Sequence, residues 1–238
     1  MIKGKKILAI IPARGGSKRL PRKNIIDLND KPLIAWSIEA GLNSKYVDRV
    51  IVSTDDIEIA KISEKWGADI PFIRPKELAT DTATTVDVIM HAIINLEEAG
   101  ERYDYIMLLQ PTSPLRSVVH VDESIELLVD QNMDNVVGVT EVSHPYEWTN
   151  ILPHNMSMDD FISDEAYLTR SQDFPKRYQI NGAIYLIKKV ALLLCKRMIC
   201  NTRSVAYIMD TSHSIDIDSL HDLKVAAVYS DGNYFDKF

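Results

Sequence analysis

The feature that most constrains the fold is the uninterrupted apolar run Ile7–Ile11 near the amino terminus. Five consecutive aliphatic residues leave no polar face, so this segment is expected to be a strand covered on both sides, as in a parallel sheet. Further short runs rich in β-branched residues predict four more strands, at 49–53, 105–109, 135–139 and 183–187.

Helical patterns fall between these runs, at about 32–43, 56–66, 85–99 and 117–130. Thr54, Asp55 and Asp56 supply the cap residues and first-turn acids that open the second of these helices. Strands that alternate with helices predict βαβ units on a mostly parallel sheet, wound right-handed. Ligands of such α/β folds bind at the carboxyl ends of the strands, so we expect the site in the loops after residues 12, 53, 109 and 213.

Residues 143–180 interrupt this alternation with three prolines, several aromatic residues and no clean period. A connection of that length is rarely without structure in a compact domain. We therefore expect one domain over residues 1–238, with a small lobe at 143–180 that takes part in subunit contact and closes over the substrate.

Charge is distributed unevenly along the chain. The formal net charge is −7, yet residues 1–31 hold nine Lys or Arg residues against two Asp. A local positive field in an acidic protein suits a small polyanion such as a nucleoside triphosphate, whereas nucleic acid would need a broader basic face.

Composition and targeting signals favour a cytoplasmic globular protein. No run approaches the roughly 18 consecutive apolar residues of a membrane helix. The basic start of the chain resembles the opening of a signal peptide, but the apolar run that follows is too short for one. Cys195 and Cys200 could form a disulfide on count alone, but two buried free thiols are the expectation.

The strongest motif follows the first predicted strand, from Pro12 to Asn24. Its adjacent glycines, Gly15 and Gly16, allow a tight turn whose N–H groups form a concavity for anions, and the basic residues of the segment add charge. The motif is neither a Walker loop nor a Gly-x-Gly-x-x-Gly turn. The alternative is a surface loop with solvated charges.

The stretch Ile11–Asn24 resembles the opening signature of the CMP-sialic acid synthetases (acylneuraminate cytidylyltransferases). The resemblance continues, in the family's order and spacing, through 52–55, 77–82, 108–116, 181–185 and 214–218. It implies a Rossmann-like nucleotidyltransferase fold and a homodimer with a swapped lobe near 143–180. It also implies transfer of CMP from CTP to the anomeric hydroxyl of a nine-carbon sialic-type sugar acid, N-acetylneuraminate first among them, with release of pyrophosphate. No nucleic acid or membrane partner is expected.

The same resemblance implies a role for each matching residue. CTP is expected to bind Arg14, Gly15, Gly16, Ser17, Lys23 and Asn24, with Thr80 near the cytosine, and the sugar acid to bind Gln110, Arg170 and Tyr185. Arg14, Lys23, Asp216 and Asp218 are the expected catalytic residues, and the two aspartates the ligands of Mg²⁺.

The segment Ile215–Asp218 has a physical logic of its own. If it is extended, alternation places Asp216 and Asp218 on one side and the isoleucines behind them. Two carboxylates on one side are suitable oxygen ligands for Mg²⁺. The alternative is a helix amino terminus with capping acids, since Ser219 onward has a helical pattern. No side chain stands out as a general base.

Several residues depart from the family pattern and leave the acceptor open. Ser171 stands where many members have a second arginine, Glu147 aligns near a lysine used by some sialic acid enzymes, and Gln179 replaces an arginine. Lys176 or Arg177 could compensate. Legionaminic, pseudaminic and Kdo-type acids are alternative acceptors, and a non-catalytic nucleotide-binding scaffold is the alternative function. The six histidines show no spacing typical of a ligand set, with His213 only a weak candidate through its nearness to Asp216.

Overall fold

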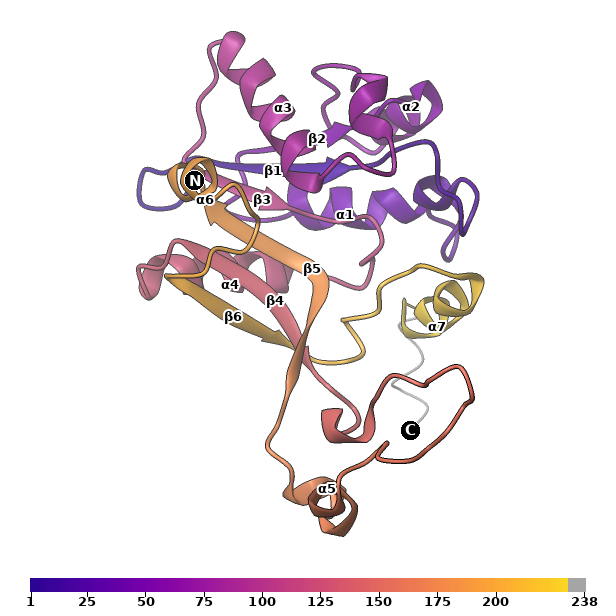
Figure 1. Ribbon diagram of the computed structural model, residues 1–238. Helices are drawn as coiled ribbons and strands as arrows, with labels where there is room; N and C mark the ends of the chain where they lie inside the picture. The colour runs from indigo at the N-terminus through magenta and orange to yellow at the C-terminus, as the bar shows by residue number, and fades with distance from the viewer. Residues whose placement is uncertain (231–238) are drawn as a thin grey trace.

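A computed structural model describes residues 1–230, so the predicted domain 1–238 includes eight residues that lie outside the described part. The core is one six-stranded sheet in the order β2-β1-β3-β5-β4-β6 (Figure 1). Its strands are β1 (Ile7–Pro12), β2 (Arg49–Ser53), β3 (Tyr105–Leu108), β4 (Asn135–Glu141), β5 (Tyr178–Lys188) and β6 (Ser204–Met209).

The sheet is mixed. β1 pairs in parallel with β2 and β3, and β4 pairs in parallel with β6. β5 runs antiparallel between β3 and β4 and joins the two parallel parts. The predicted α/β class with a mostly parallel sheet is confirmed.

Helices cover both faces of this sheet (Figure 1). Their bounds are α1 (Leu33–Leu42), α2 (Ile57–Lys65), α3 (Thr85–Glu98), α4 (Val118–Asp130), α5 (Asp164–Leu168), α6 (Lys189–Cys195) and α7 (Leu220–Ser230). Each of the four predicted helices begins and ends within about two residues of the observed helix, α1 to α4. None of the helices in residues 1–230 combines the length and apolar character needed to cross a bilayer.

Alternation along β1 explains why its whole apolar run is buried. Ile7, Ala9 and Ile11 pack in one cluster with residues of α1, α2 and α4. Leu8 and Ile10 pack in a second cluster with α3 and α6. Because helices cover both faces, the strand needs no polar side, as the sequence pattern predicted.

The sequence patterns did not predict β6, α5 or α6, and the predicted β5 began five residues late. β6 lies at the edge of the sheet, where exposed and partly buried residues alternate, so its apolar contrast is weak. The first residues of β5 are exposed and pair with the end of β4, as in Glu141 with Tyr178.

The 143–180 segment connects these extended ends of β4 and β5 and projects away from the sheet, with α5 at its far end (Figure 1). It presents large apolar side chains to solvent, Ile151 at 89% and Leu168 at 82% of their full exposure. The part it plays in subunit contact and closure stays a prediction.

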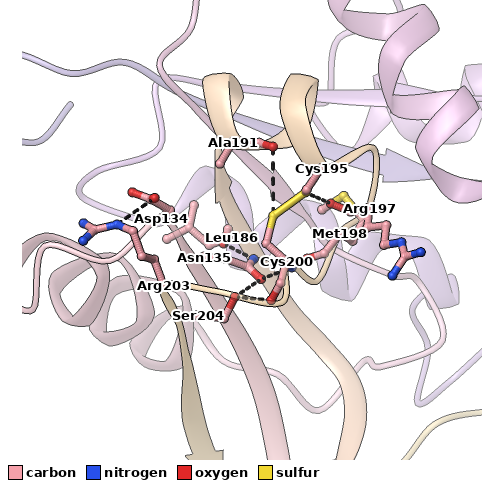
Figure 2. Close-up of a disulfide and its surroundings, with 10 residues drawn as sticks. All are labelled: Asp134, Asn135, Leu186, Ala191, Cys195, Arg197, Met198, Cys200, Arg203 and Ser204. Carbon is pink, nitrogen blue, oxygen red and sulfur yellow. Dashed lines mark hydrogen bonds and ion pairs between the residues drawn. A yellow bond between two sulfur atoms is a disulfide. The ribbon is translucent and has the colours of Figure 1, made fainter.

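The expectation of two free thiols is wrong, because Cys195 and Cys200 are joined in a disulfide (Figure 2). The fully buried Asn135 holds the loop that the bridge closes: its amide donates to the carbonyl oxygens of Leu186 (2.8 Å) and Met198 (3.1 Å), and its oxygen accepts from the Cys200 N–H. The reversal after α6, at Lys196 in the left-handed region, brings the two cysteines together, which composition alone cannot predict.

Arg116 is an unusual core residue that holds the β3–α4 connection. It is buried, and it donates to the carbonyl oxygens of Ser113 and Ala183, both at 3.1 Å, and to Ser37 Oγ at 2.6 Å. Ser37 in turn donates to the Gln110 carbonyl oxygen at 3.0 Å. Burial lowers the pKa of Arg116 to about 9. This guanidinium therefore ties the loop that carries Gln110 to β5.

We predict that Arg116→Met lowers the free energy of unfolding by about 3 kcal/mol, because the buried carbonyl oxygens of Ser113 and Ala183 lose their donor. Urea denaturation followed by circular dichroism measures this change. Arg102→Met, at an exposed arginine, is the matched control. Equal stability of the two variants would contradict the structural role of Arg116.

Candidate active site

A cavity of about 600 Å³ lies beside the end of β1, where parallel-sheet folds bind their ligands. Eight of the predicted site residues line it: Arg14, Ser17, Lys23, Asn24, Thr80, Gln110, Asp216 and Asp218. They come from segments far apart in the sequence, and the fold brings them to one place.

Gly15 has a structural role that the sequence patterns did not predict. The N–H of Gly15 donates to Asp55 Oδ1 at 3.0 Å, and a Cβ on Gly15 would lie 2.7 Å from Asp56 Oδ2. Asp56 caps α2 through the N–H groups of Glu58 and Ile59. Gly15 therefore lets the loop approach the start of α2 closely, and neither Gly15 nor Gly16 belongs to the cavity lining described by the structure. Their predicted contact with CTP stays a prediction.

The basic loop and the late aspartates line the same cavity, and Asp218 is in direct contact with the loop. Lys23 Nζ lies 3.0 Å from Asp218 Oδ1, and Arg19 Nη1 lies 2.8 Å from Asp218 Oδ2. Arg14 and Lys18 both pair with Asp81, which also lines the cavity. These cations are thus gathered at one site, where the oxygens of a triphosphate could exchange with the carboxylates as partners.

Ile217 orients the two aspartates. It is fully buried in a cluster with Leu28 and Leu33, and its N–H donates to the Thr112 carbonyl oxygen at 2.8 Å. The segment is not part of the sheet, yet Asp216 and Asp218 both line the cavity, as alternation predicted.

The helix-capping role that was the alternative for Asp216 and Asp218 belongs to other residues. Asp222 accepts from the N–H groups of Asp218 and Ser219, and the N–H of Asp222 donates to Ser219 Oγ. Ser219 and Asp222 thereby cap α7, and the Asp218 carboxylate is left to its cations in the cavity.

Electrostatics at this pair favour a bound cation. Burial raises the pKa of Asp216, and the charge of Asp218 raises it further, against a hydrogen bond from Thr112 and the charge of Lys23. Two carboxylates side by side, one of them poorly hydrated, provide the oxygen donors that Mg²⁺ prefers. The residues present therefore fit that ion.

Arg74 lines the cavity but is not among the site residues predicted from the sequence. It is buried, donates to Ser53 Oγ at 3.1 Å and to the Leu78 carbonyl oxygen at 3.3 Å, and has a pKa lowered by burial to about 10, against the opposing charge of Asp55. Its only sequence signal is an arginine set between Ile73 and Pro75 in an otherwise apolar stretch.

A second cavity, of about 740 Å³, adjoins the first and shares Thr85 and Gln110 with it. Tyr185 lines this second cavity, and burial followed by the charge of Asp216 raises its pKa. Lys196 and Arg197, from the loop closed by the disulfide, supply its positive charge.

Arg170, like Gly15 and Gly16, is a predicted site residue that lines neither cavity of its own chain. It lies in the projecting lobe and is exposed, and the lining of either cavity in residues 1–230 does not include it. Arg177 pairs with Glu147, and Lys176 pairs with Glu141 at 2.8 Å. Neither compensating cation lines the two cavities of its own chain.

Comparison with known proteins decides the family. Residues 8–235 match the family model described as cytidylyltransferase. The chain belongs to this family. It is 36% identical to the pseudaminic acid cytidylyltransferase of Campylobacter jejuni, over 98% of this chain and all of that protein.

Other relatives of this cytidylyltransferase differ in their named substrate. It is 39% identical to the N-acylneuraminate cytidylyltransferase of Escherichia coli, over 93% of this chain but 51% of that protein. Among solved structures, CMP:2-keto-3-deoxy-manno-octonic acid synthetase complexed with CTP superposes with a TM-score of 0.69 at 16% identity, covering 94% of this chain and 98% of that one. That likeness supports the nucleotidyltransferase fold.

The raised pKa of Asp216 predicts a gain in stability on its removal. A carboxyl whose pKa is higher in the folded than in the unfolded state costs stability at every pH above the raised value, and this cost vanishes below the ordinary pKa of aspartate. Asp216→Asn should therefore raise the denaturation midpoint of the metal-free protein at neutral pH, and the gain should shrink as the pH falls.

Thermal unfolding in chelator across a pH series measures this difference. Asp159→Asn, at an exposed aspartate of the lobe, is the control and should change the midpoint little. A variant at position 216 that is less stable than the parent at neutral pH would show that Asp216 holds the fold together.

Proposed function

We propose that this cytidylyltransferase transfers CMP from CTP to the anomeric hydroxyl of a nine-carbon sialic-type sugar acid and releases pyrophosphate. The observation that carries the proposal is the meeting of Lys23, Asp216 and Asp218 in one cavity that opens onto a second. A nucleotide with its ion suits the first cavity, and an acceptor suits the second.

The reaction needs positioning and charge neutralisation more than covalent catalysis. Arg14, Lys18 and Lys23 are suited to hold the phosphates so that the α-phosphorus faces the second cavity, with Thr80 near the base. The anomeric hydroxyl attacks the α-phosphorus in line and gives up its proton to water. The new phosphoester bond forms, and the bond from the α-phosphorus to the bridging oxygen breaks as pyrophosphate leaves.

Asp216 and Asp218 would hold Mg²⁺, and when bound the ion would neutralise charge on the phosphates. Lys23 and Arg19 keep Asp218 oriented in the absence of a ligand. Gln110 lines both cavities, so its side chain is suited to contact the sugar acid beside the nucleotide.

The acceptor carboxylate requires a cation. Lys196 and Arg197 line the cavity that also holds Tyr185, and an arginine offers a carboxylate two parallel hydrogen bonds. N-acetylneuraminate is the first proposed acceptor. Pseudaminic acid is the second, favoured by the full-length similarity to an enzyme of that name and by Glu147 at the expected lysine position.

We further propose a homodimer formed through the 143–180 lobe, acting in the cytoplasm. The support is the large apolar area that the lobe exposes, including Ile151, Tyr167 and Leu168. In such a dimer Arg170 of one chain would serve the second cavity of its partner, which explains its distance from the site of its own chain.

An acceptor panel tests the activity. With CTP and Mg²⁺, pyrophosphate release should be at least about 100-fold faster with N-acetylneuraminate or pseudaminic acid than with the eight-carbon 2-keto-3-deoxy-manno-octonic acid. Asp218→Ala should reduce turnover by orders of magnitude while CTP still binds, with Asp159→Ala as control. Binding of CTP without turnover of any acceptor would leave only a nucleotide-binding scaffold.

A mixing experiment tests the dimer. Arg170→Ala and Asp218→Ala should each be inactive, and a mixture allowed to exchange subunits should recover up to about a quarter of the parent activity, because half of the dimers are mixed and each has one intact site. Leu168→Asp should give monomers on size-exclusion chromatography with light scattering, and Leu194→Asp, equally exposed outside the lobe, should not. A parent protein that is monomeric and active would refute the proposal.

A further inference from the structure

Three side chains outside both cavities form a compact group of potential metal ligands. His120 comes from the first turn of α4, and Asp210 and His213 come from the loop after β6. One ligand atom of each lies within 4.8 Å of the others. We propose that His120, Asp210 and His213 bind a divalent cation of the zinc class, at a site separate from the Asp216–Asp218 pair.

The loop geometry holds Asp210 and His213 together. His213 Nδ1 lies 2.8 Å from Asp210 Oδ2, and the His213 N–H donates to Asp210 Oδ1 at 3.0 Å. Ser214 Oγ donates to the Asp210 carbonyl oxygen at 2.6 Å and closes the turn. The carboxylate and the imidazole therefore face each other before any ion arrives.

His120 completes the group from α4. Its ring lies edge-on to that of His213, with centroids 4.8 Å apart and planes at 69°. Its Nδ1 accepts a hydrogen bond from the Ser117 N–H at 3.1 Å and lies 3.2 Å from Ser117 Oγ. Because Nδ1 is engaged at the helix cap, Nε2 is the ring nitrogen left to ligate. Metal binding at Nε2 requires the ring proton on Nδ1. Nδ1 would then give up the hydrogen bond from the Ser117 N–H and donate to Ser117 Oγ, the outer hydrogen bond that orients a metal-bound histidine.

The donor set distinguishes this site from the magnesium pair. Two imidazoles and one carboxylate suit Zn²⁺, Co²⁺ or Ni²⁺, whereas Mg²⁺ prefers oxygen ligands alone. Three protein ligands leave a fourth tetrahedral position for water. Asp210 is exposed and the two histidines are partly exposed, so an ion can enter.

Two of the three proposed ligands lie in the same loop as the Asp216–Asp218 pair. His213 and Asp216 belong to one loop, and Ser214 of that loop also accepts from Asn181 Nδ2 at 3.0 Å. An ion shared by His120 and His213 would tie this loop to α4, and so would stabilise the segment that presents Asp216 and Asp218.

Calorimetric titration of the chelator-treated full chain with ZnCl₂ alone tests the proposal. One ion should bind per chain, and His213→Gln, His120→Gln and Asp210→Asn should each weaken binding at least about tenfold. His154→Gln, at an exposed histidine of the lobe, should bind as the parent does. The double variant Asp216→Asn, Asp218→Asn should also bind zinc normally, because it leaves all three ligands intact.

Two further measurements guard against misfolded variants. Zn²⁺ should raise the melting temperature of the parent but not of Asp210→Asn, which retains the shape of the side chain. Co²⁺ should give the intense visible absorption of a tetrahedral site in the parent but not in Asp210→Asn. No zinc binding by the parent, binding unchanged in His213→Gln, or binding lost in the Asp216, Asp218 double variant would each overturn the proposal.

Discussion

The candidate active site depends on the packing of Ile217 into an apolar cluster. This side chain packs with Leu28 and Leu33 below the basic loop, while its N–H binds the Thr112 carbonyl oxygen. Its neighbours in sequence must then face away from the cluster, into the cavity. The ion pair between Lys23 and Asp218, which joins the two ends of the chain, is a consequence of that apolar anchor.

The charges of the site suit a bound ligand and lower the stability of the ligand-free protein. Cations of the first loop take Asp81 and Asp218 as partners, whereas Asp216 has a raised pKa because burial and a neighbouring carboxylate both disfavour its charged form. A nucleotide with its divalent ion would supply the missing balance. Such destabilised groups are typical of binding sites rather than of cores.

Buried polar residues outside the second cavity, the proposed acceptor cavity, hold the loops that line it. Arg116, through Ser37, holds the backbone of Gln110, the residue common to both cavities. Asn135 holds the disulfide-closed loop that carries Lys196 and Arg197 (Figure 2). Changes at these buried polar residues would therefore reach the acceptor cavity without touching a substrate.

The sequence by itself determined five of the six strands, helices α1 to α4, the basic loop after β1 and the orientation of Asp216 and Asp218 toward one side. These depend on local periodicity, which the chain carries within a few residues. Only the tertiary structure decided the pairing of Cys195 with Cys200, the entry of Arg74 into the cavity and the meeting of His120 with His213. The disulfide spans only five residues but needs the chain reversal at Lys196, which composition does not reveal. The other two outcomes depend on how separate elements pack, and no local pattern records the distance between segments that lie far apart in the chain.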